Sequence, residues 1–198
     1  IGLAPDVPGG YAEYLAMPAH YAMKVPDGLD LKLAALTEPL AVGLHAVQAA
    51  GSVLGARVTI IGAGPIGLSV LLFAKAGGAR RIVVAEPGDA RRALAAGFGV
   101  ETVVSAEDAT GPAPDIVFEC VGVPGVIQQI IDGAPNDARI VVVGVCMESD
   151  RIEPFFLDDH HVHRLVNGLD DIGLTEQFAD EITAFEATRP DFLPRVGH

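Results

Sequence analysis

Residues 57–76 read RVTIIGAGPIGLSVLLFAKA and change character twice. The β-branched run Arg57–Ile61 favours a strand, and the apolar run Leu68–Ala76 favours a buried helix. Between them lies the turn GAGPIG, residues 62–67, whose glycines suit tight backbone conformations. A GxGxxG turn is weak evidence by itself, but a strand before it and a helix after it are what a dinucleotide-binding turn requires. The stretch therefore predicts a strand–turn–helix unit that binds a dinucleotide.

Five of the six residues of the turn have predicted roles in cofactor binding. Gly62 permits the tight turn, Gly64 lacks a Cβ so that a pyrophosphate can approach the backbone, and Gly67 lets the helix pack close to the strand. Pro65 and Ile66 begin the helix, where free N–H groups and the helix dipole favour phosphate, and where the missing N–H of proline costs nothing. The alternative interpretation is a glycine-rich turn in a fold that binds no ligand.

Short apolar strands and helices alternate on both sides of this stretch. The expected strands are residues 57–61, 81–85, 101–104, 115–119 and 139–143, and the expected helices are residues 31–37, 39–50, 68–76, 89–96 and 125–132. Strands that alternate with helices form right-handed crossovers and a parallel sheet. We therefore expect an α/β fold of the Rossmann type, a doubly wound parallel sheet with helices on both faces.

Both ends of the chain depart from this alternation. Residues 11–24 read as irregular strand material, which predicts the remnant of a second, mostly β domain. After about residue 150 the strand–helix pattern fades, and only helical hints such as residues 175–185 remain. We expect three parts: the remnant over residues 1–36, the dinucleotide-binding domain over residues 37–157, and a divergent C-terminal segment over residues 158–198.

Composition and charge narrow the class of protein. Half of the 198 residues are hydrophobic and the net charge is −13, which suits a buried core and disfavours nucleic acid or an acidic membrane as a partner. The two cysteines, Cys120 and Cys146, are too few for a four-cysteine zinc site. The most apolar stretch, residues 58–74, is interrupted by glycines and a proline, and no signal peptide is visible, so we expect a cytoplasmic protein. The chain begins with Ile1 in place of Met, which indicates processing or a fragment.

Glu86 supplies a second sign of a dinucleotide site. It stands at the end of the next expected strand, 22 positions beyond Gly64, where an acidic residue binds the adenosine ribose hydroxyls. A carboxylate about 4 Å from a 2′-phosphate costs roughly 4 kcal/mol at an effective dielectric constant of 20, which favours NAD over NADP. Arg91 and Arg92 favour NADP, because guanidinium groups bind phosphate, although both also fit a surface role.

The ends of two later strands are expected beside the nicotinamide half of the cofactor. In open α/β sheets, ligands bind outside the carboxyl ends of the strands. Cys120 and Val121 follow one such strand, and Val143, Gly144 and Val145 follow the next. Cys120 also fits a nucleophile, but no neighbouring His or Lys in the sequence supports that role, so we favour a small apolar wall residue.

Several motifs together resemble one enzyme family. TEPLAVGLHAV (residues 37–47), GAGPIG, the acidic strand end at Glu86, and DIVFECVG (residues 115–122) are similar to the zinc-dependent medium-chain alcohol and polyol dehydrogenases. The likeness extends over about residues 9–144. It implies a Rossmann cofactor domain, an alcohol as small-molecule substrate, and hydride transfer between that alcohol and NAD. In such enzymes zinc acts as a Lewis acid on the alcohol oxygen.

The resemblance also implies roles for individual residues. Glu38 falls at a position in the coordination sphere of the catalytic zinc, and Val42 falls beside the nicotinamide. Glu86 and Arg91 match the ribose-binding acid and the basic residue five places later. The nicotinamide-side contacts of the family match Val121, Val143 and Val145. From the residues alone, Glu38 is better explained as a helix-start carboxylate stabilised by the helix dipole.

The chain departs from the family at both ends. The family takes a Cys and a His–Glu pair for zinc from a domain that precedes the matched segment, and it closes with a strand and helix that residues 158–198 do not show. The spacing of His160, His161 and His163 fits no standard zinc motif. The chain is therefore a fragment of a full enzyme, a natural short relative that binds NAD(H) without chemistry, or an interaction domain without a ligand. Alone, it should bind NADH but hold no stoichiometric zinc and turn over no alcohol. The resemblance further implies a homo-oligomer paired through a sheet edge at residues 151–156.

Overall fold

The computed structural model describes residues 9–109, 111–135, 137–146 and 164–167. Contacts between Cα atoms divide the chain into two units, Ile1–Thr37 and Glu38–His198. The expected edge strand at residues 151–156, the histidines at residues 160–163 and the helical segment at residues 175–185 lie outside the described residues.

The first unit contains little regular structure. It consists of a 3-10 turn, η1 (Ala19–Tyr21), and a short helix, α1 (Leu31–Ala34). Asp30 caps α1 as expected, because its side chain accepts a hydrogen bond from the Lys32 N–H at 2.8 Å. The strand expected within residues 11–24 is wrong. An isolated strand needs neighbours for its backbone hydrogen bonds, and this segment pairs with no strand in the described part of the chain.

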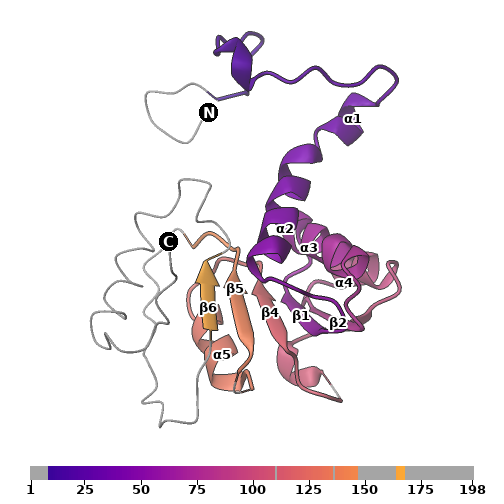
Figure 1. The fold of residues 1–198 in the computed structure, drawn as a ribbon, viewed down its shortest axis with the longest axis vertical. Helices are drawn as coiled ribbons and strands as arrows, with labels where there is room; N and C mark the ends of the chain where they lie inside the picture. Colours follow the sequence, from indigo (N-terminus) through magenta and orange to yellow (C-terminus); the bar gives the residue numbers. More distant parts are fainter. Residues whose placement is uncertain (1–8, 110, 136, 147–163, 168–198) are drawn as a thin grey trace, which may run out of the picture. The chain divides into compact units, whose positions relative to one another are not determined.

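The second unit is built on a six-stranded sheet in the order β3-β2-β1-β4-β5-β6, with every pair parallel (Figure 1). The strands are β1 (Arg57–Ile61), β2 (Arg81–Ala85), β3 (Glu101–Val103), β4 (Ile116–Glu119), β5 (Arg139–Val142) and β6 (Arg164–Asn167). This order turns back at β1, where the chain crosses from β3 over to β4, and it is the order of the doubly wound Rossmann fold. The expected fold class is confirmed.

In this unit, one helix precedes β1 and three others connect strands. They are α2 (Thr37–Ala49), α3 (Pro65–Ala76), α4 (Asp89–Ala96) and α5 (Val126–Gly133), with the 3-10 turn η2 (Ala106–Asp108) after β3. β1, β2 and α4 have the bounds expected from the sequence. α3 extends the apolar run of residues 68–76 back to Pro65, which occupies the first position after the N-cap Gly64, as its predicted place in the first helical turn requires.

Two separate hydrophobic cores show that helices cover both faces of the sheet. One core joins residues of α2 and α3, among them Val47 and Leu71, to alternate strand residues such as Ile60 and Phe118. The other joins Val117, Ile140 and Val142 to Ile127 and Ile130 of α5. Figure 1 shows α3 and α4 beside β1 and β2, and α5 beside β5.

One strand corrects the sequence analysis. β6 lies within residues 158–198, where no strand was expected, and pairs with β5 from Arg139↔Arg164 onward. The four-residue stretch RLVN is too short to predict by periodicity alone, and its partner strand lies 25 positions earlier.

Between β3 and β4, η2 stands where a helix commonly connects strands. A hollow there is lined by Val83, Pro112 and Ile130, among others, and none of the expected cofactor-binding residues lines it.

Within the described residues, no helix combines the length and the apolar character needed to cross a bilayer.

Candidate functional site

The glycine turn joins β1 to α3 through close backbone packing. Gly62 has a φ of +97°, a left-handed conformation that favours glycine, and its N–H donates to the Ala85 carbonyl of β2 at 2.8 Å. A Cβ on Gly67 would overlap the carbonyl oxygen of Gly62. Both glycines are therefore explained by the protein itself: Gly62 by its backbone conformation and Gly67 by the contact between α3 and the turn.

Gly64 is not explained by the protein. Its φ of −70° and ψ of −178° are open to any residue, and a Cβ built there meets no atom within 4 Å. Neither backbone strain nor packing within the described residues requires glycine at this position. The space beside Gly64 is therefore open to a ligand that contacts the protein backbone.

The first turn of α3 opens onto the same space. Pro65 is the first helical residue, and the Leu68 N–H donates to the Gly64 carbonyl at 2.9 Å. The N–H groups of Ile66 and Gly67 precede that bond, so helix geometry gives them no carbonyl partner within α3. Free N–H groups and the positive end of the helix dipole make this turn suited to a phosphate group.

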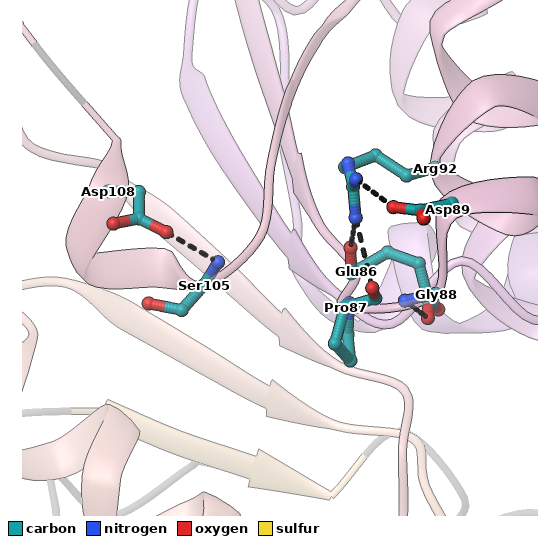
Figure 2. Close-up of polar contacts among 7 residues, drawn as sticks. All are labelled: Glu86, Pro87, Gly88, Asp89, Arg92, Ser105 and Asp108. Carbon is teal, nitrogen blue, oxygen red and sulfur yellow. Dashed lines mark hydrogen bonds and ion pairs between the residues drawn. The ribbon is translucent and has the colours of Figure 1, made fainter.

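Glu86 follows β2 and is tied to the glycine turn. Its side chain is 3% exposed. One carboxylate oxygen accepts the Ala63 N–H at 2.9 Å, and the other accepts the Gly88 N–H at 2.8 Å and lies 3.1 Å from the Arg91 guanidinium (Figure 2 shows the Gly88 contact). Burial of this carboxyl raises its pKa, but the hydrogen bonds from Ala63 and Gly88 and the charge of Arg91 together hold the pKa below its usual value. Glu86 is therefore a carboxylate at neutral pH.

Two arginines at the start of α4 differ in their surroundings. The Arg92 guanidinium donates to the carbonyls of Glu86 and Pro87, at 2.9 and 3.0 Å, and pairs with Asp89 (Figure 2). It therefore fixes the loop between β2 and α4. The Arg91 side chain is 61% exposed and its guanidinium lies 3.1 Å from the Glu86 carboxylate, which leaves it accessible to a ligand.

The ends of β4 and β5 lie on the other side of the turn. The Cys120 N–H donates to the Ile61 carbonyl at the end of β1, at 2.9 Å, and a Cβ on Gly62 would come within 2.9 Å of the Val121 side chain. Val121 and Val145 are 43% and 44% exposed. The structure thus brings Gly62, Cys120 and Val121 together at one edge of the sheet, as their places at strand ends predict.

The remaining residues of these strand ends are less accessible. Val143 is buried in the core, so only its backbone is available for a contact. Burial raises the pKa of the Cys120 thiol, and the nearby Glu119 carboxylate raises it further. A thiol that keeps its proton is a poor nucleophile, which supports the role of wall residue for Cys120.

Sequence reasoning missed Glu119, the last residue of β4. It is 1% exposed, and its carboxylate accepts hydrogen bonds from the N–H groups of Val121, Gly122 and Gly144. Only the segment ECVG hinted at it: an acidic residue ends an apolar strand immediately before a glycine-containing loop.

Helix α2 carries the two residues that the family resemblance assigned near the reaction centre. A Cβ on Gly43 would overlap Ser69 of α3, so α2 and α3 pack in close contact. Val42 packs against the core next to this contact, whereas Glu38 is exposed. The described residues contain no group of three His, Cys, Asp or Glu side chains placed to hold a metal ion. Catalytic zinc needs three protein ligands, so this part of the chain does not fit a zinc site.

The sequence profile of the zinc-binding dehydrogenases matches residues 65–170. This chain belongs to that family. A second profile, that of the C-terminal domain of the 3-isopropylmalate dehydratase small subunit, matches residues 171–195, which lie outside the described residues.

Individual relatives agree with this assignment. Sorbitol dehydrogenase of Gallus gallus is 35% identical over 153 residues, which cover 71% of this chain and 43% of that protein. A zinc-binding dehydrogenase from Sinorhizobium meliloti 1021, bound to NADP, superposes with a TM-score of 0.63 at 28% identity, over 83% of this chain and 52% of that one. For 2R,3R-butanediol dehydrogenase from Bacillus subtilis the TM-score is 0.61 at 28% identity, over 83% of this chain and 49% of that one. The chain spans less than half the length of the curated relatives it matches.

Proposed function

We propose that this chain is the cofactor-binding domain of a zinc-dependent alcohol or polyol dehydrogenase, which transfers hydride between an alcohol and NAD. The observation that carries the proposal is the open space beside Gly64 at the free N–H groups of α3. A glycine that neither strain nor packing requires, placed at the start of a buried helix after a parallel strand, is accounted for by close approach of a pyrophosphate.

The other residues of the edge fit the two ends of a dinucleotide. On the β2 side, the buried Glu86 carboxylate and exposed Arg91 are suited to the adenosine ribose. On the β4 and β5 side, the exposed Val121 and Val145 present an apolar surface suited to the nicotinamide ring. The cofactor, when bound, accepts or supplies the hydride at its nicotinamide ring. The role of this chain is to fix that ring and shield it from water.

NAD is the proposed cofactor form. The Glu86 carboxylate is ionised at neutral pH and would repel a 2′-phosphate. Arg91 reduces that repulsion, because its guanidinium lies 3.1 Å from the same carboxylate. The zinc-binding dehydrogenase from Sinorhizobium meliloti is bound to NADP, so NADP is the competing form. The preference of this chain therefore depends on which of the two opposed charges meets the ribose.

The substrate is proposed to be a small alcohol or polyol. Relatives named for sorbitol, butanediol and xylulose support this class. Because the described residues do not fit a zinc site, we assign no step to zinc within this part of the chain. Glu38 is the one residue we propose as a contributor to a zinc coordination sphere, on the family resemblance alone.

A second candidate is a module that binds NAD(H) without chemistry. It is favoured by the lack of a metal-binding group in the described residues. Zinc analysis and an alcohol-oxidation assay on the purified chain test whether it reacts by itself. Stoichiometric zinc with turnover would overturn the prediction that the chain alone shows neither. NADH binding without either fits both the cofactor-binding domain and the module, and the reading frame upstream of Ile1 then separates the two, because only the enzyme needs a region that supplies zinc ligands. If the chain binds no NADH, the result supports an interaction domain without a ligand.

We further propose a cytoplasmic location, domain limits at residues 36 and 157, and a homo-oligomer joined through the sheet edge. The support for the last is that a sheet edge offers unpaired backbone groups to a second copy. Light scattering coupled to size-exclusion chromatography tests it, and a monomer across the concentration range would exclude it.

A further inference from the structure

Glu119 is a buried acid that the proposed function does not use. Its Oε1 accepts the N–H groups of Val121 and Gly122 at 2.7 and 2.8 Å, and its Oε2 accepts the N–H of Gly144 at 3.2 Å. Burying a carboxylate is unfavourable unless hydrogen bonds replace its water. No salt bridge reaches Glu119 within the described residues, so these backbone N–H groups replace that water.

These hydrogen bonds join two loops that are far apart in the sequence. Gly122 follows β4 and Gly144 follows β5, and the backbones of the two loops touch. A Cβ on Gly122 would lie 2.5 Å from the Val145 carbonyl oxygen, and a Cβ on Gly144 would lie 2.5 Å from the Glu119 carboxylate. The backbone of Glu119 adds to the link, because its carbonyl accepts the N–H groups of Val143 and Gly144 at 2.9 and 3.0 Å.

The link fixes the exposed apolar residues of both loops. Val121 donates its own N–H to Glu119, and Val145 directly follows Gly144, yet both valines are more than 40% exposed. Their backbones are thus held while their side chains remain free for a contact. The position of this surface depends on a carboxylate that lies beneath it and does not reach solvent.

A second buried acid fixes a loop on the other side of β1. Glu86 of the β2 end holds the glycine turn through the Ala63 N–H at 2.9 Å. β1 lies between β2 and β4 in the sheet, so the two carboxylates flank the glycine turn. Glu86 controls the side assigned to the adenosine ribose, and Glu119 controls the side assigned to the nicotinamide.

We propose that Glu119 is the positioning residue for the nicotinamide half of the cofactor, acting through the loops that carry Val121 and Val145. This inference rests on the proposed function, since it presupposes that a dinucleotide binds along this edge. Glu119 does not touch the cofactor. Its carboxylate sets where the two valines meet the ring.

The test measures how each half of the cofactor contributes to binding. ADP-ribose contains the adenosine and pyrophosphate but lacks nicotinamide, so it reports only on the β1 and β2 side. In Glu119→Gln the side chain keeps its size, but its NH2 group faces either Gly144 or the pair Val121 and Gly122, and one set of hydrogen bonds is lost. We expect the Kd for NADH to rise about tenfold, as for the loss of one hydrogen bond to a charged group, while the Kd for ADP-ribose stays within about twofold. The fluorescence of bound NADH should also fall toward that of free NADH.

Two control variants make the pattern specific. Asp132→Asn removes one charge from the exposed end of α5, away from the carboxyl ends of the strands, and should change neither Kd. Glu86→Gln should weaken ADP-ribose and NADH together. If Glu119→Gln weakens both ligands equally, or neither, the inference is wrong. If the wild-type chain binds neither ligand, the proposed function fails instead.

Should Glu119→Gln not fold, backbone NMR of the wild-type chain gives the answer. The amide signals of Gly122 and Gly144 should shift on adding NADH and stay in place on adding ADP-ribose. Amide signals that do not shift on adding NADH, or that shift equally with both ligands, would overturn the role of Glu119.

Discussion

The carbonyl oxygen of Gly62 occupies the space that a Cβ atom on Gly67 would need. The contact is between backbones, so no side chain can move aside to relieve it. In Gly67→Ala the first turn of α3 must shift away from β1. We expect the free energy of unfolding to fall by about 1–3 kcal/mol, the usual range for overpacking, with a lower urea midpoint. A midpoint equal to that of the wild type would show that the turn and helix are not in contact.

Gly64→Ala is the matched variant within the same turn. A Cβ at Gly64 meets open space, and the backbone there is compatible with alanine, so we expect wild-type stability. The Kd for NADH should rise by at least about tenfold, because the methyl group fills space reserved for the pyrophosphate. The two variants together separate folding from binding: unchanged NADH affinity in a folded Gly64→Ala chain would contradict the proposed site.

Cofactor preference should depend on Glu86. In Glu86→Gln the negative charge disappears while the hydrogen-bonding size is kept, so NADH binding should weaken and NADPH should gain relative to it. Arg91→Ala should lower the affinity for NADPH relative to that for NADH, since it removes the positive charge beside the Glu86 carboxylate. Competition titrations with both nucleotides measure the ratio. A ratio that is the same in wild type and Glu86→Gln would remove Glu86 from the ribose site.

Acid stability should depend on the pair that joins the starts of β1 and β4. Arg57 donates from its backbone N–H at 2.8 Å and its side-chain Nε at 2.9 Å to Asp115, and these bonds lower the pKa of Asp115 from 3.8 to about 2. A carboxyl whose folded pKa is depressed stabilises the fold fully above the unfolded value. Its contribution is lost as the pH falls from about 4 to about 2.

Asp115→Asn tests this pair. The Asp115 side chain is 39% exposed, so solvent screening reduces the expected loss to about 1 kcal/mol at pH 7. The difference in free energy of unfolding between wild type and variant should shrink as the pH approaches 2. Urea titrations at pH 7, 4 and about 2.5 follow it. A difference that does not change with pH would mean that the ionised pair contributes nothing.

The contact between α2 and α3 gives a prediction about Ser69. Its hydroxyl is buried and has no hydrogen-bond partner within the described residues, and Gly43 packs directly on its side chain. Ser69→Ala should leave stability unchanged or raise it by up to about 1 kcal/mol, because it removes an unpaired polar group. Ser69→Val enlarges the side chain against Gly43 and should lower stability by about 1–3 kcal/mol. Thermal melts of both variants check the pair, and a destabilised Ser69→Ala would show that the hydroxyl has a partner.

The elements that sequence reasoning located well are those with strong local signals. Arg57–Ile61 and Arg81–Ala85 are β-branched runs bounded by turn residues, and their bounds are confirmed. The failures are long-range. Residues 11–24 have strand-like composition but no partner strand among the described residues, and Arg164–Asn167 becomes a strand only because β5 lies beside it.

The candidate site divides in the same way. The glycine turn and Glu86 could be located because a local pattern carries them. Glu119 could not, because its role depends on Gly144, which stands 25 residues later and reaches it only through the pairing of β4 with β5. Glu38 remains a prediction from family resemblance, since its exposed side chain has no metal-binding group around it in the described residues.

The most direct test is titration of the purified 198-residue chain with NADH, followed by the fluorescence of the nicotinamide. The chain contains no Trp, so protein emission does not obscure the signal. We predict a saturable change with one NADH per chain that ADP-ribose competes away, without stoichiometric zinc and without alcohol turnover. No saturable change in a folded chain would contradict the account that the open space beside Gly64 holds a dinucleotide.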